Sequence, residues 1–335
     1  MRLAPIVVGT LLAAGVASAQ PAQVDDNATH VAVTPAKLTQ PSKPAKADRK
    51  AEAKKLAAIA VEPNEYTNDP VLGQATRVSG EEARGVVHFT FDDGPNPETT
   101  PAVLDALAKY DVPATFFVVT RRLAGKHGEK PREILARTIA DGHLVASHSV
   151  THRHLGKATG KTLDAELDAS FKALSLAAKQ PIGLFRAPFG ALGGAGRARL
   201  KKLGVTEVFW SIDTLDWQAK DADKLRKKTL QMIVKQNGGV VLFHDVKQVT
   251  AEIIAGVLDD LEAENCKRLA AKQDPIVPVS LHYFLRDGKK ARAVPEAVTK
   301  RTDAYKQALP GRCAKRPAPA PIADPKATPA AKPAP

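Results

Sequence analysis

Residues 86–95 read Val-Val-His-Phe-Thr-Phe-Asp-Asp-Gly-Pro, an apolar and β-branched run that ends in two carboxylates and a turn. Runs of this length and composition are typical of β-strands. Gly94 and Pro95 favour a turn, so the strand is expected to end at the carboxylates. Adjacent carboxylates leaving a strand point in different directions. One can therefore bind a metal ion while its neighbour acts as a base.

The alternation of apolar runs with helical periodicity continues toward the C-terminus. We predict strands at 86–91, 115–119, 144–147, 183–186, 207–212 and 239–243, and helices at 100–109, 131–141, 163–178, 192–203, 222–236 and around 253–261. This order predicts a parallel sheet covered by helices, either an open doubly wound sheet or a closed barrel. In both folds the chemistry lies at the carboxyl ends of the strands.

Polar motifs follow four further strands at that position. They are His148 to His152, Arg186 to Gly190, Asp216-Trp217, and Leu242 to His244. Two histidines four residues apart can ligate one metal ion, although His143 and His154 also fit by spacing alone. A histidine directly after a strand is well placed for acid catalysis. Together the strand ends indicate a single active site.

With these motifs in order, residues 86–245 resemble the NodB-homology polysaccharide deacetylases, carbohydrate esterase family four. The matching segments are TFDDGP at 90–95, HSVTH at 148–152, RAPFG at 186–190, DW at 216–217 and LFH at 242–244. The resemblance implies a distorted, incomplete (β/α) barrel. The Lys- and Pro-rich segments on either side lie outside it.

The resemblance also implies a role for each motif residue. Asp92 would be the general base, oriented and kept ionised by Arg186, and His244 the general acid, supported by Asp216. The remaining roles are metal ligation by Asp93, His148 and His152, an oxyanion hole at the Phe189 backbone N–H, and an acetyl pocket lined by Trp217 and Leu242. Many members have Tyr in place of Phe189 and a polar amide in place of Ser147, so contacts to the sugar and support of His148 are expected to differ.

Hydrolysis of an N-acetyl amide requires a nucleophile, oxyanion stabilisation and a proton for the departing amine. Three protein ligands leave metal positions open for water and the acetyl oxygen, so the metal can generate hydroxide and act as a Lewis acid. The ligand set favours Zn²⁺, with Co²⁺, Ni²⁺ or Mn²⁺ as alternatives. We predict removal of N-acetyl groups from N-acetylglucosamine units of peptidoglycan or a chitin-like polysaccharide, with release of acetate. The alternatives are O-deacetylation of acetylated xylan and a catalytically silent glycan-binding relative.

Composition divides the chain into four parts. Residues 1–19 are typical of a signal peptide with the cleavage pattern Ala17-Ser18-Ala19. Residues 20–79 predict a disordered Lys/Pro/Ala-rich linker, 80–310 the deacetylase domain, and 311–335 a disordered Pro/Ala-rich tail. We therefore expect an exported protein, periplasmic or secreted, with no membrane span after signal cleavage.

The formal net charge is +13, from 49 Lys and Arg against 36 Asp and Glu. Outside the inner membrane this charge favours polyanions such as cell-wall polymers, through a screened and nonspecific field. Only 5% of residues are aromatic and no recognition motif is present, which argues against nucleic acid as a partner. We expect a monomer.

Cys266 and Cys313 are the two cysteines of the chain. An oxidising, exported context is compatible with a disulfide between them, and the sequence does not decide whether it forms. Two unpaired thiols are the alternative, and their separation does not suggest a metal site.

Overall fold

The computed structural model describes residues 72–316. The predicted signal peptide, the predicted linker up to residue 71 and the predicted tail from residue 317 lie outside the described residues. Within 72–316, each helix is too short or too polar to cross a bilayer.

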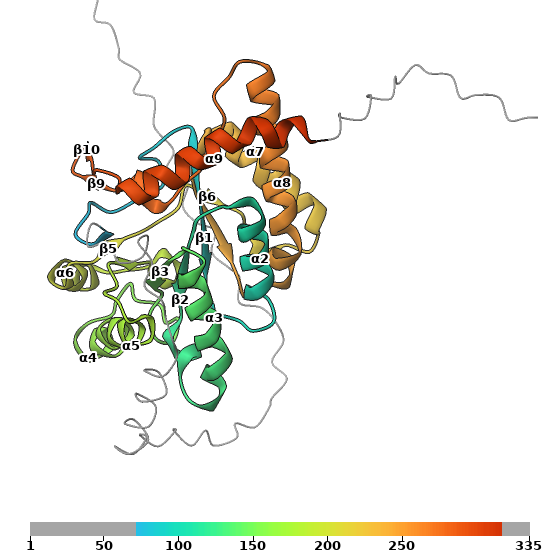
Figure 1. Ribbon diagram of the computed structural model, residues 1–335. Helices are drawn as coiled ribbons and strands as arrows, with labels where there is room; N and C mark the ends of the chain where they lie inside the picture. The colour runs from blue at the N-terminus through green and yellow to red at the C-terminus, as the bar shows by residue number, and fades with distance from the viewer. Residues whose placement is uncertain (1–71, 317–335) are drawn as a thin grey trace, which may run out of the picture. The chain divides into compact units, whose positions relative to one another are not determined.

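A parallel sheet forms the centre of this region (Figure 1). Its strands are β1 (Val86–Asp92), β2 (Ala114–Val118), β3 (Leu144–Ser147), β4 (Leu184–Phe185), β5 (Thr206–Glu207), β6 (Ile212–Asp213), β7 (Gly238–His244) and β8 (Val277–Pro278). They are ordered β5-β4-β3-β2-β1-β7-β6, and β8 pairs with the start of β1. Strand β1 is therefore central, with parallel neighbours on both sides.

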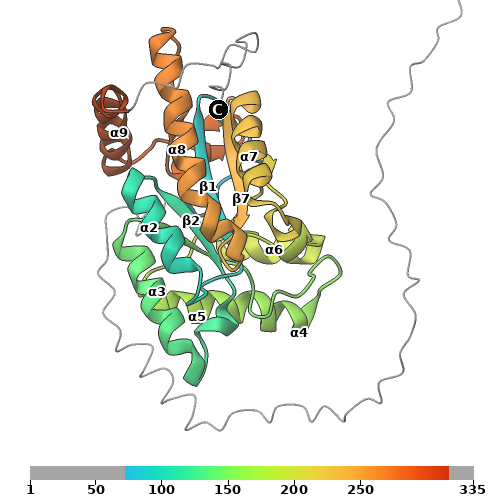
Figure 2. The same cartoon turned by 90° about the vertical axis from the view of Figure 1, so that its right-hand side faces the viewer.

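Helices surround the sheet (Figures 1 and 2). They are α2 (Thr100–Tyr110), α3 (Glu129–Ala140), α4 (Gly160–Leu163), α5 (Ala169–Ala178), α6 (Gly194–Leu203), α7 (Ala222–Gln236), α8 (Gln248–Ala270) and α9 (Glu296–Ala314). Apolar side chains of α2, α7 and α8 pack in one cluster with β1, β2 and β7, whereas those of α3, α5 and α6 pack with β3 and β4.

Strand alternation determines which residues of β1 reach the site. Val87, Phe89 and Phe91 pack in the cluster that contains α2 and α8. Successive side chains of a strand point to opposite faces, so Asp92 lies on the face away from these helices. On β7, Val241 and Phe243 belong to the same helix-facing cluster, which leaves Leu242 and His244 on the face of Asp92.

The prediction of one strand at 207–212 is wrong, and the difference explains the shape of the sheet. Glu207 ends β5 at one edge, and Ile212 begins β6 at the other. In a flat sheet, edges six strand spacings apart would be about 29 Å apart, whereas five Cα steps span at most about 18 Å. The sheet must therefore curl, and the link hydrogen-bonds to both sides: the Val208 N–H donates to the Phe185 carbonyl (2.8 Å) and the Ser211 N–H to the Val240 carbonyl (3.1 Å). The predicted distorted, incomplete barrel is confirmed.

Further features were not predicted, among them strand β8 and helix α9. The segment η4 (Asp164–Asp168), which lies between α4 and α5, is π-helical. An antiparallel pair, β9 (Arg286–Asp287) and β10 (Lys290–Ala291), precedes α9.

The folded region extends beyond the predicted limits of 80 and 310. Val78 is fully buried and bridges Val208. At the other end α9 continues to Ala314, and Cys313 forms a disulfide with Cys266 of α8. Single anchoring residues such as Val78 and Cys313 are not detected by the overall composition of the flanking segments.

We expect Cys313→Ser to lower the free energy of unfolding by roughly 4 kcal/mol, because the disulfide closes a long loop in the unfolded chain. The separation of the cysteines is 47 residues. Denaturant unfolding of the oxidised protein measures the loss, and reduced wild type serves as the control. Equal stability of oxidised wild type and variant would contradict the prediction.

Candidate active site

A cavity of about 410 Å³ opens at the carboxyl ends of the strands. Eight of the ten predicted site residues line it: Asp92, Asp93, His148, His152, Phe189, Trp217, Leu242 and His244. The other two, Arg186 and Asp216, are buried behind it and bond to Asp92 and His244. The structure thus brings together all ten residues, although their roles remain predictions.

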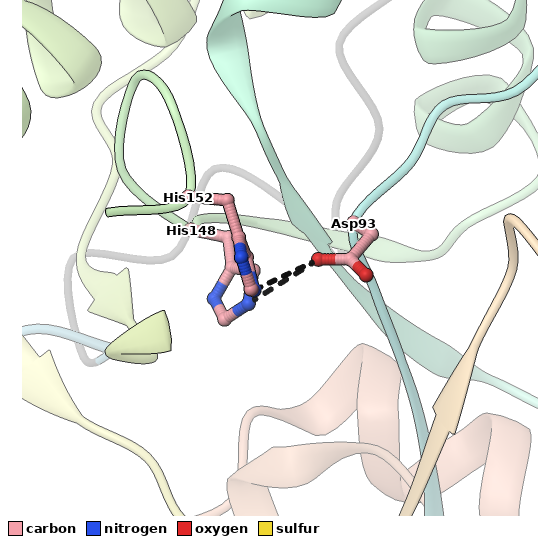
Figure 3. Close-up of side chains that lie close together, drawn as sticks. All are labelled: Asp93, His148 and His152. Atoms are coloured by element: carbon pink, nitrogen blue, oxygen red, sulfur yellow. Dashed lines mark ion pairs between the residues drawn. The ribbon is translucent and has the colours of Figure 1, made fainter. Parts of the chain in front are cut away.

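Asp93, His148 and His152 form a candidate metal centre (Figure 3). Each offers one ligand atom, and these atoms lie within 4.8 Å of one another. Asp93 Oδ1 is 3.2 Å from His152 Nε2 and 3.6 Å from His148 Nε2, and no hydrogen-bond donor satisfies this buried oxygen in the described region. An orphaned carboxylate oxygen facing two imidazole nitrogens fits a divalent cation.

The ring of His148 is held in a ligating orientation. Its Nδ1 lies 2.8 Å from the Arg186 carbonyl oxygen, which favours the tautomer with the proton on Nδ1. Nε2 then presents a lone pair toward Asp93. Burial is the main cause that lowers the pKa of His148 to about 3, so the imidazole is neutral, as a metal ligand must be.

The two histidines that spacing alone left open do not join this cluster. His143 is buried elsewhere, where its Nδ1 accepts a hydrogen bond from the Ala114 N–H (3.2 Å). The ring of His154 lies beside Phe189, and its nitrogens belong to no ligand group in the described region.

Asp92 is paired with a buried guanidinium. Arg186 Nη1 donates to Asp92 Oδ1 (2.7 Å) and to Thr90 Oγ1 (2.8 Å), and both members of the ion pair are almost fully buried. Burial raises the pKa of Asp92, and the charge of Arg186 offsets part of that rise. The sequence prediction considered the guanidinium alone and omitted this larger effect of desolvation. The result is a carboxylate more basic than an exposed one.

His244 is hydrogen-bonded to the buried carboxylate of Asp216. Its Nδ1 lies 2.7 Å from Asp216 Oδ1, and Asp216 Oδ2 accepts from the His244 backbone N–H (2.7 Å) and Thr250 Oγ1. Burial alone would lower the His244 pKa, but the hydrogen bond and charge of Asp216, with smaller effects of Asp92 and Asp93, raise it to about 9. The imidazole is therefore protonated at neutral pH.

The walls of the cavity include two exposed aromatic side chains and a buried leucine. Phe189 is 69% exposed and Trp217 53%, whereas Leu242 is buried at the base. Phe189 has φ +59, a left-handed conformation that bulky residues rarely adopt. Such strain concentrates at functional sites.

Two acidic residues that the sequence analysis did not identify hold the site loops. Asp245 is buried behind Gly94 and accepts from Thr100 Oγ1 (2.6 Å). A Cβ added to Gly94 would lie 2.0 Å from Asp245 Oδ2, so the Asp-Gly turn requires glycine there. The other residue, Glu166, lies in the π-helical segment η4.

Glu166 is bonded to the loop between the two candidate histidine ligands. Its carboxylate accepts from the backbone N–H groups of Val150 (3.1 Å) and Thr151 (2.9 Å) and from Thr151 Oγ1 (2.6 Å). Ser149 and His152 in this loop have positive φ, so the loop needs external support. Ser147, where a different support for His148 was expected, bonds instead to Ser170 Oγ (2.7 Å). No local pattern marks Glu166, because it contacts residues fifteen and sixteen positions earlier.

We expect Glu166→Gln to weaken metal binding about 10- to 100-fold, as loss of an outer support typically does. The amide would place an N–H group against the N–H and O–H donors of Val150 and Thr151, so the loop would no longer be held in position. Competition with a chelator measures the metal Kd, and Glu133→Gln, an exposed glutamate paired with Lys130, is the control. Equal metal affinity in both variants would show that Glu166 does not support the ligand loop.

A curled β/α sheet with a candidate metal centre at its carboxyl edge is an architecture suited to a metal-dependent hydrolase. The family model for polysaccharide deacetylase matches residues 79–208. A chitooligosaccharide deacetylase of Bradyrhizobium sp. (strain ANU 289) is 37% identical over 160 residues, which cover 48% of this chain and 70% of that protein. The chain therefore belongs to the polysaccharide deacetylase family, a family of hydrolases.

Two further comparisons agree with this assignment. A peptidoglycan-N-acetylglucosamine deacetylase of Listeria monocytogenes serotype 1/2a (strain 10403S) is 31% identical over 178 residues, 53% of this chain and 36% of that protein. The solved structure of the Bc1960 peptidoglycan N-acetylglucosamine deacetylase is similar with a TM-score of 0.50 and 25% identity, covering 57% of this chain and 88% of that one.

Proposed function

We propose that this protein is a metal-dependent hydrolase that removes N-acetyl groups from N-acetylglucosamine units of a polysaccharide and releases acetate. The observation that carries the proposal is the joint placement of a candidate metal centre, a basic carboxylate and a protonated imidazole around one cavity. The names of the similar deacetylases support N-acetylglucosamine as the acetylated sugar. Asp93, His148 and His152 would hold the cation, with Zn²⁺ proposed from the ligand types.

The base and the acid come from neighbouring strands. Asp92 and His244 are register partners of β1 and β7, so their backbones lie one strand spacing apart. The bound cation would supply Lewis-acid polarisation and lower the pKa of water. Asp92 takes the proton of the attacking water, and Arg186 holds the carboxylate oxygen that does not face the cavity.

His244 completes the reaction by giving its Nε2 proton to the departing nitrogen. Asp216 fixes the proton on Nδ1 and stabilises the charged ring before transfer. The Phe189 backbone N–H would donate to the oxyanion, and Trp217 and Leu242 would enclose the acetyl methyl group. These roles apply to an amide because its nitrogen must be protonated to leave.

We propose export on the basis of the signal-like residues 1–19, with a cell-wall glycan as the substrate.

Acetate release tests the proposed function. Purified protein loaded with Zn²⁺ should release acetate from chitooligosaccharides and peptidoglycan strands, whereas Asp92→Asn should not. Absence of acetate from both substrates in the metal-loaded protein would refute the proposed function, and release from acetylated xylan alone would make it an O-deacetylase.

A further inference from the structure

A second cavity, of about 370 Å³, lies beside the catalytic cavity, between residues 214–219 and the first half of α7. Residues Leu215 and Gln218 line it, whereas Asp213 and Trp217 of the same segment line the catalytic cavity. The segment from 213 to 218 therefore separates the two spaces. Three lysines, Lys220, Lys224 and Lys228, line the second cavity, which we call the lysine groove.

The charge of the lysine groove is not neutralised by the protein. Its three lysines are exposed, and no carboxylate in the described region forms an ion pair with any of them. The one acidic residue lining the groove, Asp221, caps α7 by accepting from the Lys224 backbone N–H (2.9 Å). Other lysines of the described region form ion pairs, for example Lys130 with Glu133 and Lys300 with Glu296.

The lysines are also placed to act together. Lys224 and Lys228 are one helical turn apart on α7, where like charges repel and destabilise the helix. A fourth ammonium group, Lys247, lines the catalytic cavity itself. An anionic ligand that bridges the groove and the cavity would relieve this repulsion and gain from all four charges.

We propose that the lysine groove binds carboxylates carried by the glycan whose acetylated sugar occupies the catalytic cavity. This inference rests on the proposed function and narrows its substrate class to an acidic, carboxylate-substituted glycan, such as a peptide-bearing wall strand, in preference to neutral chitin. Lysine is a flexible point charge that suits such variably placed carboxylates. The groove selects the substrate and takes no part in the proton transfers.

The test compares two triple variants with equal charge. The groove variant is Lys220→Gln/Lys224→Gln/Lys228→Gln, and the control is Lys172→Gln/Lys202→Gln/Lys289→Gln, which removes three exposed charges outside the groove. We expect the groove variant alone to raise KM for peptidoglycan strands on the order of tenfold, with kcat unchanged. KM for chitooligosaccharide should not change, and amidation of the strand carboxylates or 1 M salt should abolish the difference between variants.

Two results would overturn the inference: an equal rise in KM in both variants, which indicates only the general positive field, or no rise in the groove variant. Sedimentation of each variant with peptidoglycan strands measures binding independently of turnover. If the wild type releases no acetate from any substrate, the proposed function fails, but weaker sedimentation of the groove variant still supports the groove.

Discussion

His244→Asn is expected to lower kcat by about 10²- to 10⁴-fold, the usual effect of removing a proton-transfer group. The change should also alter the pH profile. Because the pKa of His244 is raised to about 9, the acid is protonated below that pH and lost above it. Wild-type kcat/KM should therefore fall as pH rises through about 9, and the residual activity of the variant should lack this fall.

Metal content separates this effect from damage to the metal centre. His244 is not among the candidate ligands, so the variant should retain its metal. Asp216→Asn is the companion variant: with the main cause of the raised pKa weakened, its alkaline limb should move to lower pH. An unchanged alkaline limb in His244→Asn would assign that limb to another group and remove the general-acid role from His244.

His148→Ala is expected to abolish both stoichiometric metal binding and acetate release. The change removes the most buried of the three candidate ligands and leaves two, which cannot complete a three-ligand site. Elemental analysis of the dialysed protein measures metal, and thermal unfolding provides a second readout. Added Zn²⁺ should raise the Tm of the wild type, because a ligand that binds the folded state stabilises it. It should not raise the Tm of the variant.

His154→Ala is the matched control for this prediction. His154 lies near the centre but outside the ligand group, and its ring is beside Phe189. The control should keep full metal content and metal-dependent stabilisation. Full metal content in His148→Ala would show that the ligand set is wrong.

The strand ends could be predicted from the sequence because each motif is local. The apolar run of β1 and the carboxylates that follow it are contiguous, and the same holds for the segment ending at His244. Parallel strands bring their carboxyl ends to one edge, so short motifs far apart in the chain were expected to meet. The positions of the cavity-lining residues agree with that expectation.

The features that could not be predicted depend on long-range geometry. Residues 208–210 and Ile212 are apolar, so the segment resembled one strand and its pattern did not show that the chain crosses from one edge to the other. Glu166 is typical of an exposed helix face in sequence, and only tertiary packing turns its carboxylate to the ligand loop. The raised pKa of Asp92 likewise depends on burial, which cannot be read from the presence of Arg186 in the sequence.

The central position of β1 sets how this protein is expected to fold. Besides its pairing with the nearby β2, this strand bonds to segments far along the chain: the Thr90 hydroxyl donates to the Val241 carbonyl, 151 residues away, and His88 Nδ1 bonds to the Val279 carbonyl, 191 residues away. Chains dominated by such distant pairs fold slowly, because loop closure precedes the contacts that reward it. Asp92 and His244 cannot meet before β7 joins β1, so the site forms only with this long-range pairing. Activity should thus return on refolding no earlier than the protection of the β7 amides that pair with β1 from hydrogen exchange.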